Sequence, residues 1–182
     1  FAGAATGTVT EDTAVNANGN LVSSGTLTIS DVDAGQSTFK AGTAVPVGTT
    51  LGSLSIAENG TWTYNVANSA VQYLAAGQTK TESFTVSAAD GTTTVVTVTI
   101  TGTNDIPTFA GAATGTVTED TAVNANGNLV SSGTLTISDA DAGQSTFKAG
   151  TAVPVGSTLG SLSIAANGAW TYNVPNSAVQ YL

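Results

Sequence analysis

The sequence contains no cysteine, no histidine and no arginine. Without cysteine, neither a disulfide framework nor a thiolate metal site can form. Without histidine, the most common general base and the most common ligand of transition metals are both missing. The chain also has no apolar run of about 18 residues, so the sequence predicts no membrane-spanning helix and no membrane insertion.

Charge is scarce and mostly negative. The 182 residues include 12 acids and three lysines, which give a formal net charge of -9, and only 8% of all residues are charged. Proteins that bind nucleic acid need basic patches, so this balance argues against a nucleic-acid partner. An acidic surface favours solubility and attracts cations.

The length fits one or two small domains, and a hydrophobic content of 41% is enough for a core. The 21 glycines are typical of a fold rich in turns. No signal peptide is visible and the chain begins within a repeat, so we expect it to be a piece of a longer protein.

A long internal repeat organises the chain. Residues 109–182 align with residues 1–74 without a gap, and 69 of the 74 positions are identical. The period of 108 residues is the size of a small domain and much longer than a solenoid repeat. We therefore expect one complete domain over residues 1–106 and a second copy, residues 107–182, that lacks its last two strands.

Each copy has the pattern of a β protein, because short runs of Val, Ile and Thr alternate with Gly, Asn and Asp turns. One helical turn is expected within Asn68–Leu74. The strands predicted for the first copy are Thr8–Thr10, Gly25–Ser30, Thr38–Ala41, Leu51–Ile56, Thr61–Val66, Glu82–Ala88 and Thr93–Thr101.

Seven such strands in about 100 residues predict an all-β fold of tandem immunoglobulin-like, seven-stranded β-sandwiches, with the second copy incomplete. Trp62, Tyr64 and Val66 alternate along one strand and fall on one face of it. We interpret the two aromatic residues as core residues and not as a platform for stacking sugars.

The acids gather in turns. Ten of the 12 follow strands at the ends of the predicted domains. When two copies are stacked end to end, the bottom of the first meets the top of the second. This junction would collect six side chains, namely Glu11, Asp12, Asn104, Asp105, Asp139 and Asp141. The upstream junction would use Asp31, Asp33 and Asp90, and the downstream junction would use Glu119 and Asp120.

Carboxylates crowded in this way repel one another and need a counter-charge. Ca²⁺ fits best, because it takes six to eight oxygen ligands in flexible geometry, whereas Mg²⁺ demands a near-octahedral shell. Transition metals are disfavoured by the missing histidine and cysteine. The sequence thus predicts Ca²⁺ as the cofactor. No EF-hand is present, since Gly42 and Gln36 stand where that loop needs glutamate and glycine.

The segments "TVTED", "TISDVDAG", "SFTVSAADG" and "VTVTITGTNDIP" resemble, in this order, the calcium motifs of cadherins. More closely, "GTVTEDTAVNANGNLVSSGTLTISDVDAGQSTF" and "ENGTWTYNV" resemble the VCBS repeats of giant bacterial surface adhesins, including RTX-type biofilm adhesins. The resemblance covers the whole chain. It implies calcium-stiffened tandem modules, secreted and extended from a bacterial cell surface, with Glu11, Asn104, Asp105, Asp139 and Asp141 as direct ligands.

One stretch departs from that pattern. Cadherins carry an acidic motif before the sixth strand, whereas "AAGQTKTE" here contains only Glu82. Backbone carbonyls or water would then complete the calcium shell.

The function predicted from the sequence is a calcium-stiffened extender of a surface adhesin, with neighbouring repeats of the same chain as its partners. Two alternatives stay open. One is a self-associating filament or matrix subunit that completes its fold by exchanging strands with like chains, and the other is a glycan-binding module. An enzyme is not expected, because the acids lie at domain ends and the sequence has no histidine, no cysteine nucleophile and no G-x-S-x-G motif.

Overall fold

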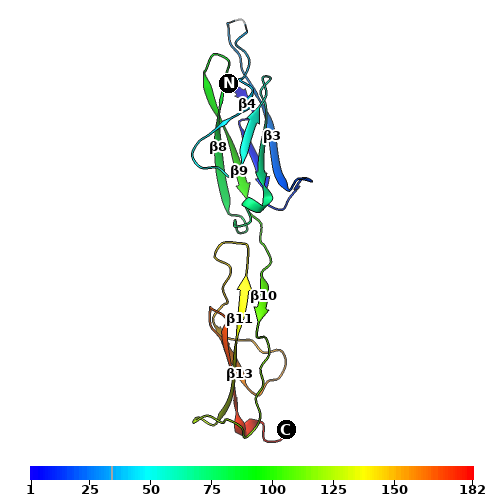
Figure 1. The fold of residues 1–182 in the computed structure, drawn as a ribbon, viewed down its shortest axis with the longest axis vertical. Helices are drawn as coiled ribbons and strands as arrows, with labels where there is room; N and C mark the ends of the chain where they lie inside the picture. Colours follow the sequence, from blue (N-terminus) through cyan, green and yellow to red (C-terminus); the bar gives the residue numbers. More distant parts are fainter. Residues whose placement is uncertain (34) are drawn as a thin grey trace. The chain divides into compact units, whose positions relative to one another are not determined.

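The structure is a computed structural model that describes residues 1–33 and 35–182. The chain divides into two compact units, Phe1–Asp105 and Ile106–Leu182 (Figure 1). Each unit is described by itself below.

The first unit is a β-sandwich of two sheets (Figure 1). Five strands form one sheet in the order β1-β3-β7-β6-β4, and four form the other in the order β2-β9-β8-β5. Their bounds are β1 (Ala2–Gly3), β2 (Thr6–Thr10), β3 (Asn20–Thr28), β4 (Gly42–Thr43), β5 (Val45–Pro46), β6 (Ser53–Ile56), β7 (Thr61–Ala67), β8 (Thr79–Ser87) and β9 (Thr93–Thr101).

Strict alternation of apolar and polar residues gives each long strand one buried face. On β7, Trp62 and Tyr64 are fully buried, as predicted. On β8 and β9 the side chains that face the core are 0–2% exposed, and these are Phe84, Val86, Val96, Val98 and Ile100. The two sheets close one continuous core, so the prediction of an all-β sandwich is confirmed.

The first predicted strand changes sheets part-way along. β1 pairs with β3 in one sheet, while β2 runs parallel to β9 in the other. The change follows Gly3, whose φ of 96° lies in the left-handed region that favours glycine. The strand therefore covers an edge of each sheet in turn.

The third predicted strand, Thr38–Ala41, is wrong. Phe39 makes only an isolated bridge to Ala88, because its N–H is bonded to the carbonyl of Glu58 while the Lys40 N–H reaches Ser87 in the other sheet. Regular pairing starts later, where β4 joins β6 and β5 joins β8. The segment thus crosses from one sheet to the other instead of extending either.

The second unit contains one five-stranded sheet, in the order β10-β11-β14-β13-β12. The register of β11 on β14 repeats that of β3 on β7, from Asn128↔Pro175 to Thr134↔Ala169. Within the residues described for this unit, no strand corresponds to β2, β5, β8 or β9. The bounds are β10 (Thr108–Gly111), β11 (Asn128–Ser138), β12 (Gly150–Thr151), β13 (Ser161–Ile164) and β14 (Ala169–Pro175).

A single turn of 3-10 helix follows the central strand in each unit. The expected turn within Asn68–Leu74 is η1 (Asn68–Ala70), and η2 (Asn176–Ala178) repeats it. Among the residues that the structure covers, no helix is long and apolar enough to cross a membrane.

Candidate functional site

Glu11 follows β2 at one end of the first unit and is fully buried, with 0% of its surface exposed. Its Oε1 accepts a hydrogen bond of 2.9 Å from the Gln72 side chain, and its Oε2 accepts one of 2.9 Å from the backbone N–H of Thr103. The linker segment that begins after β9 is therefore tied to a buried carboxylate. The structure places Asn104 and Asp105 one and two residues beyond this tie.

Asp12 continues the same network. Its Oδ1 accepts hydrogen bonds from the amides of Asn68, at 2.6 Å, and Gln72, at 3.1 Å. The Asp12 N–H donates to Asn68 Oδ1 at 3.0 Å, so the pair is bonded twice. Asp12 has a φ of 56°, a left-handed conformation that Asp tolerates better than most residues. Gln72 thus bridges the carboxylates of Glu11 and Asp12.

The second unit repeats this arrangement at Glu119 and Asp120. Asp120 accepts hydrogen bonds from Asn176, at 2.7 Å, and from Gln180, at 2.9 Å. The Asn176 amide, and next the Gln180 amide, lower the pKa of the Asp120 carboxyl from its ordinary value. Glu119 differs from Glu11, because its Oε2 is buried and has no hydrogen-bond partner among the described residues.

Asn104 and Asp105 lie in the linker segment at the same end of the first unit as Glu11. The Asn104 side-chain amide donates to the backbone carbonyl of Asp105. Asp105 is half-buried, and its Oδ2 is shielded from solvent. The structure therefore brings four of the predicted ligands of the first unit (Glu11, Asp12, Asn104 and Asp105) to one end of that unit.

The DxD pairs close tight turns after β3 and β11. The Asp33 N–H donates to Asp31 Oδ1, and the Asp141 N–H donates to Asp139 Oδ1, each at 2.9 Å. Their burial differs, since Asp141 is 1% exposed whereas Asp33 is exposed. Gln144 donates to Asp141 Oδ2 at 3.1 Å. The second pair is thus a buried acidic group in its own unit.

Asp90 lies in the turn between β8 and β9 and closes that turn itself. Its carboxylate accepts hydrogen bonds from the Thr92 hydroxyl, at 2.6 Å, and from the Thr92 N–H, at 2.7 Å. The hydroxyl, and next the N–H, lower the pKa of Asp90. This local structure accounts for Asp90 without a bound ion.

Over residues 1–33 and 35–182, no three or more acidic side chains converge into a group that could hold a metal ion. The donor set at the Glu11 end still suits a hard cation, because two carboxylates lie within reach of one amide. A half-turn of the Gln72 amide would present its carbonyl oxygen in place of its N–H donors. The residues present therefore fit Ca²⁺ in chemistry and leave part of its shell to other oxygens.

Sequence reasoning missed the amides of this network. Asn68 and Gln72 lie four residues apart, on the turn of helix and just after it, and they recur as Asn176 and Gln180. Identity at that spacing in both copies was the available signal. It carried little weight because neither residue lies near an acid in the sequence.

Glu82 was also misjudged, as an acid that might belong with the calcium motifs. It is 2% exposed and accepts hydrogen bonds from the N–H groups of Leu51, at 2.6 Å, and Gly52, at 3.0 Å, and from the Tyr64 hydroxyl, at 2.8 Å. It is a buried structural carboxylate inside the sandwich.

The family model for bacterial cadherin-like domains matches residues 1–102, which is more than half of the chain. The chain belongs to the bacterial cadherin-like domain family. This agrees with the sandwich, with the acids at its end and with the cadherin-like order of motifs in the sequence. No curated protein matches the chain.

Two solved structures have similar folds. One, described as a Ca²⁺-stabilised adhesin that helps an Antarctic bacterium reach out and bind ice, is 24% identical, with a TM-score of 0.30 and 98% of this cadherin-like chain covered. The other concerns host cell surface retention of a 1.5-MDa bacterial ice-binding adhesin and is 21% identical, with a TM-score of 0.28 and again 98% coverage. The chain spans 42% and 56% of their lengths.

Proposed function

We propose that this chain is an extender segment of a bacterial cell-surface adhesin, in which Ca²⁺ stiffens the junctions between cadherin-like domains. The observation that carries the proposal is the buried Glu11, hydrogen-bonded to Thr103 at the start of the inter-domain linker. A carboxylate held there can transmit the binding of a cation to the linker. The role proposed is mechanical and not catalytic.

In this proposal Glu11, Asp12, Asn104 and Asp105 supply oxygens from one domain. Asp139 and Asp141 supply them from the next. Burial of the Asp141 carboxylate supports the assignment, since a charge removed from water needs a compensating charge or hydrogen bonds. Asp31, Asp33 and Asp90 would serve an upstream junction in the same way, and Glu119 and Asp120 a downstream one.

Extracellular calcium modules bind Ca²⁺ with dissociation constants of about 10⁻⁴–10⁻³ M. A cation at 100 times its dissociation constant stabilises the bound state by about 2.7 kcal/mol. The stalk would therefore be stiff in calcium-rich surroundings and bend when calcium is scarce. Secretion, membership of the VCBS-repeat and RTX-type adhesins, and a role in biofilms are parts of the same proposal and follow from the sequence resemblance.

The glycan-binding alternative has little support from the burial of its candidate residues. Trp62 and Tyr64 are 0% exposed and inside the core, so neither can stack on a sugar in the folded domain. Tyr73, at 41% exposed, is the remaining candidate of that set. We therefore propose the extender function and not a lectin.

Small-angle X-ray scattering tests the proposal. The full chain is measured in millimolar calcium and again in EDTA, alongside a Glu11→Gln variant. We expect a narrower distribution of maximum dimensions with calcium in the parent chain and a smaller difference in the variant. Identical scattering of the parent chain in the two buffers would refute calcium stiffening.

A further inference from the structure

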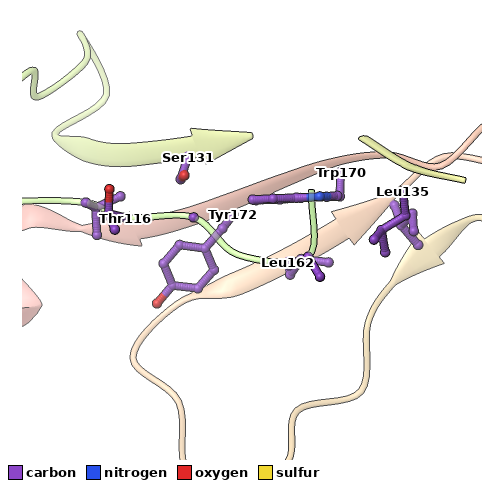
Figure 2. A pocket seen from close by; sticks show the side chains of 10 residues that line it. Thr116, Ser131, Leu135, Leu162, Trp170 and Tyr172 are labelled. Atoms are coloured by element: carbon purple, nitrogen blue, oxygen red, sulfur yellow. The ribbon is translucent and has the colours of Figure 1, made fainter. Parts of the chain in front are cut away.

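The second unit leaves the apolar face of its sheet open. A groove of about 340 Å³ runs along this face. Figure 2 shows Trp170, Tyr172, Leu162 and Leu135 along it, with the segment that carries Thr116 beside them. Tyr172, Leu162 and Ile164 are only half-buried, whereas their counterparts in the first unit are 0–5% exposed.

The first unit shows what covers such a face. There the hairpin of β8 and β9 lies over Trp62 and Tyr64 and completes the core. All ten residues that line the groove of the second unit are identical to their counterparts 108 residues earlier. A hairpin that fits the first sheet therefore meets the same side chains on the second.

Polar groups of the second unit also match that hairpin. Tyr64 donates its hydroxyl to Glu82 of β8, and its counterpart is Tyr172 at the groove. Leu51 and Gly52 donate their N–H groups to the same carboxylate, and their counterparts are Leu159 and Gly160. One carboxylate at the position of Glu82 would thus find three donors in equivalent positions.

Glu119 adds an independent observation. Its Oε2 is buried without a hydrogen-bond partner in the described part of the chain, whereas Glu11 Oε2 accepts the N–H of Thr103, two residues after β9. A buried polar atom left without a partner costs free energy. The backbone N–H that follows a β9-like strand is the group that satisfies this atom in the first unit.

The edge segment next to the groove also awaits a strand. Residues 114–118 are not assigned to a strand, although the same sequence forms β2 in the first unit. β2 owes its regular structure to a parallel ladder with β9, from Thr6↔Thr97 to Thr10↔Thr101. Main-chain pairing of this kind is the usual mode of β-strand addition.

We propose that the second unit binds, from another polypeptide, a β-hairpin with the chemistry of residues 79–103. The hairpin supplies an apolar face, one buried carboxylate and the backbone N–H that Glu119 lacks. The donor is a hairpin not already used in its own sandwich. Two intact copies gain nothing by exchange, because the core-facing residues of β8 and β9 are already 0–2% exposed. The inference does not depend on calcium.

The experiment adds a synthetic peptide covering Ala75–Asp105 to the full chain in EDTA. Calorimetry should give one peptide bound per chain. Methyl and ring signals of Leu162, Ile164 and Tyr172 should shift in NMR spectra, and those of the first unit should not. Changing the peptide and not the chain leaves the fold of the acceptor intact.

Two peptide variants test the chemistry. Val98→Asp places a charge against the groove and should weaken binding on the order of a hundredfold. Glu82→Ala removes the acceptor for three donors and should weaken binding about tenfold or more. Equal binding of the Val98→Asp peptide would overturn the proposal.

Three further outcomes would also overturn it. The first is absence of binding by the parent peptide. The second is a set of NMR shifts confined to the first unit, which would mean that the peptide displaces β8 and β9 there. The third is a self-associated chain in sedimentation equilibrium that does not dissociate when peptide is added, because a second copy would then be the occupant of the groove.

Discussion

The Tyr64 hydroxyl donates a hydrogen bond of 2.8 Å to Glu82 Oε2 inside the first sandwich, where both side chains are at most 2% exposed. The same carboxylate holds the loop at Leu51 and Gly52. One acid therefore joins β7, β8 and the loop before β6. A buried carboxylate of this kind is tolerated because its oxygens are hydrogen-bonded.

Removal of this acid should destabilise the first unit. Glu82→Ala leaves three buried donors without an acceptor, and we expect a loss of about 3 kcal/mol in the free energy of unfolding. Tyr64→Phe removes one bond to a charged group and should cost about 1.5–3 kcal/mol. Chemical denaturation followed by tyrosine and tryptophan fluorescence measures both.

The matched control is Tyr172→Phe in the second unit. Among the described residues, the Tyr172 hydroxyl makes no hydrogen bond, so this change should cost less than about 0.5 kcal/mol. Equal losses for the two Tyr→Phe variants would contradict the role given to Glu82.

Alkaline pH should unfold the first unit through Tyr64. Burial, and next the hydrogen bond and the charge of Glu82, raise the pKa of Tyr64 above its ordinary value of 10.0. Since the folded state favours the neutral phenol, its contribution to stability is present below pH 10.0 and is lost as pH rises above that value. Thermal unfolding between about pH 8 and pH 12 should fall more steeply for the parent chain than for Tyr64→Phe.

Gly25 is required by the indole ring of Trp62. A Cβ added at Gly25 would lie 2.6 Å from Trp62 Cζ2, closer than real Cβ atoms approach. Because Trp62 is fully buried and cannot move aside, Gly25→Ala should cost about 1–3 kcal/mol of stability. Ser24→Ala, at the exposed neighbouring position of β3, is the control and should change little. A neutral Gly25→Ala variant in a thermal melt would show that the ring has room to move.

Gln72 offers a direct test of cation binding at the end of the first unit. Gln72→Glu puts a third carboxylate beside Glu11 and Asp12, where the parent amide donates hydrogen bonds to both. Like charges repel, so the variant should melt at a lower temperature than the parent in EDTA, and calcium should restore more of the loss.

The control for added charge is Ser24→Glu on the exposed face of β3. It changes the net charge equally but lies in the middle of a strand. Differential scanning calorimetry with and without calcium compares the two variants. If calcium raises both melting temperatures by the same amount, the Gln72 position is not part of a cation site.

Much of the fold could be predicted because burial follows the alternation of side chains. The pattern of Trp62, Tyr64 and Val66 predicts a core strand, and these side chains are 0–2% exposed. Thr38–Ala41 failed because its hydrogen bonds go to Glu58 on one side and Ser87 on the other. Crossing between sheets is set by tertiary contacts and leaves no period in the sequence.

The candidate site was less predictable for the same reason. Turns after strands predicted that Glu11 lies at the same end as the linker, and the bond to Thr103 agrees with this. The role of Gln72 depends on where a turn of helix ends in space, which no local pattern gives. Glu82 was misread because a strand pattern does not show which acid has hydrogen-bond donors waiting inside the core.

Calorimetric titration of calcium into the full chain tests the central claim most directly. The parent should bind with a dissociation constant of about 10⁻⁴–10⁻³ M. Asp139→Asn combined with Asp141→Asn should abolish one binding event, and Glu58→Gln, which removes an acid outside the proposed ligand set, should leave all events intact. Absence of binding heat in the parent at millimolar calcium, or an unchanged titration for the double variant, would contradict the account.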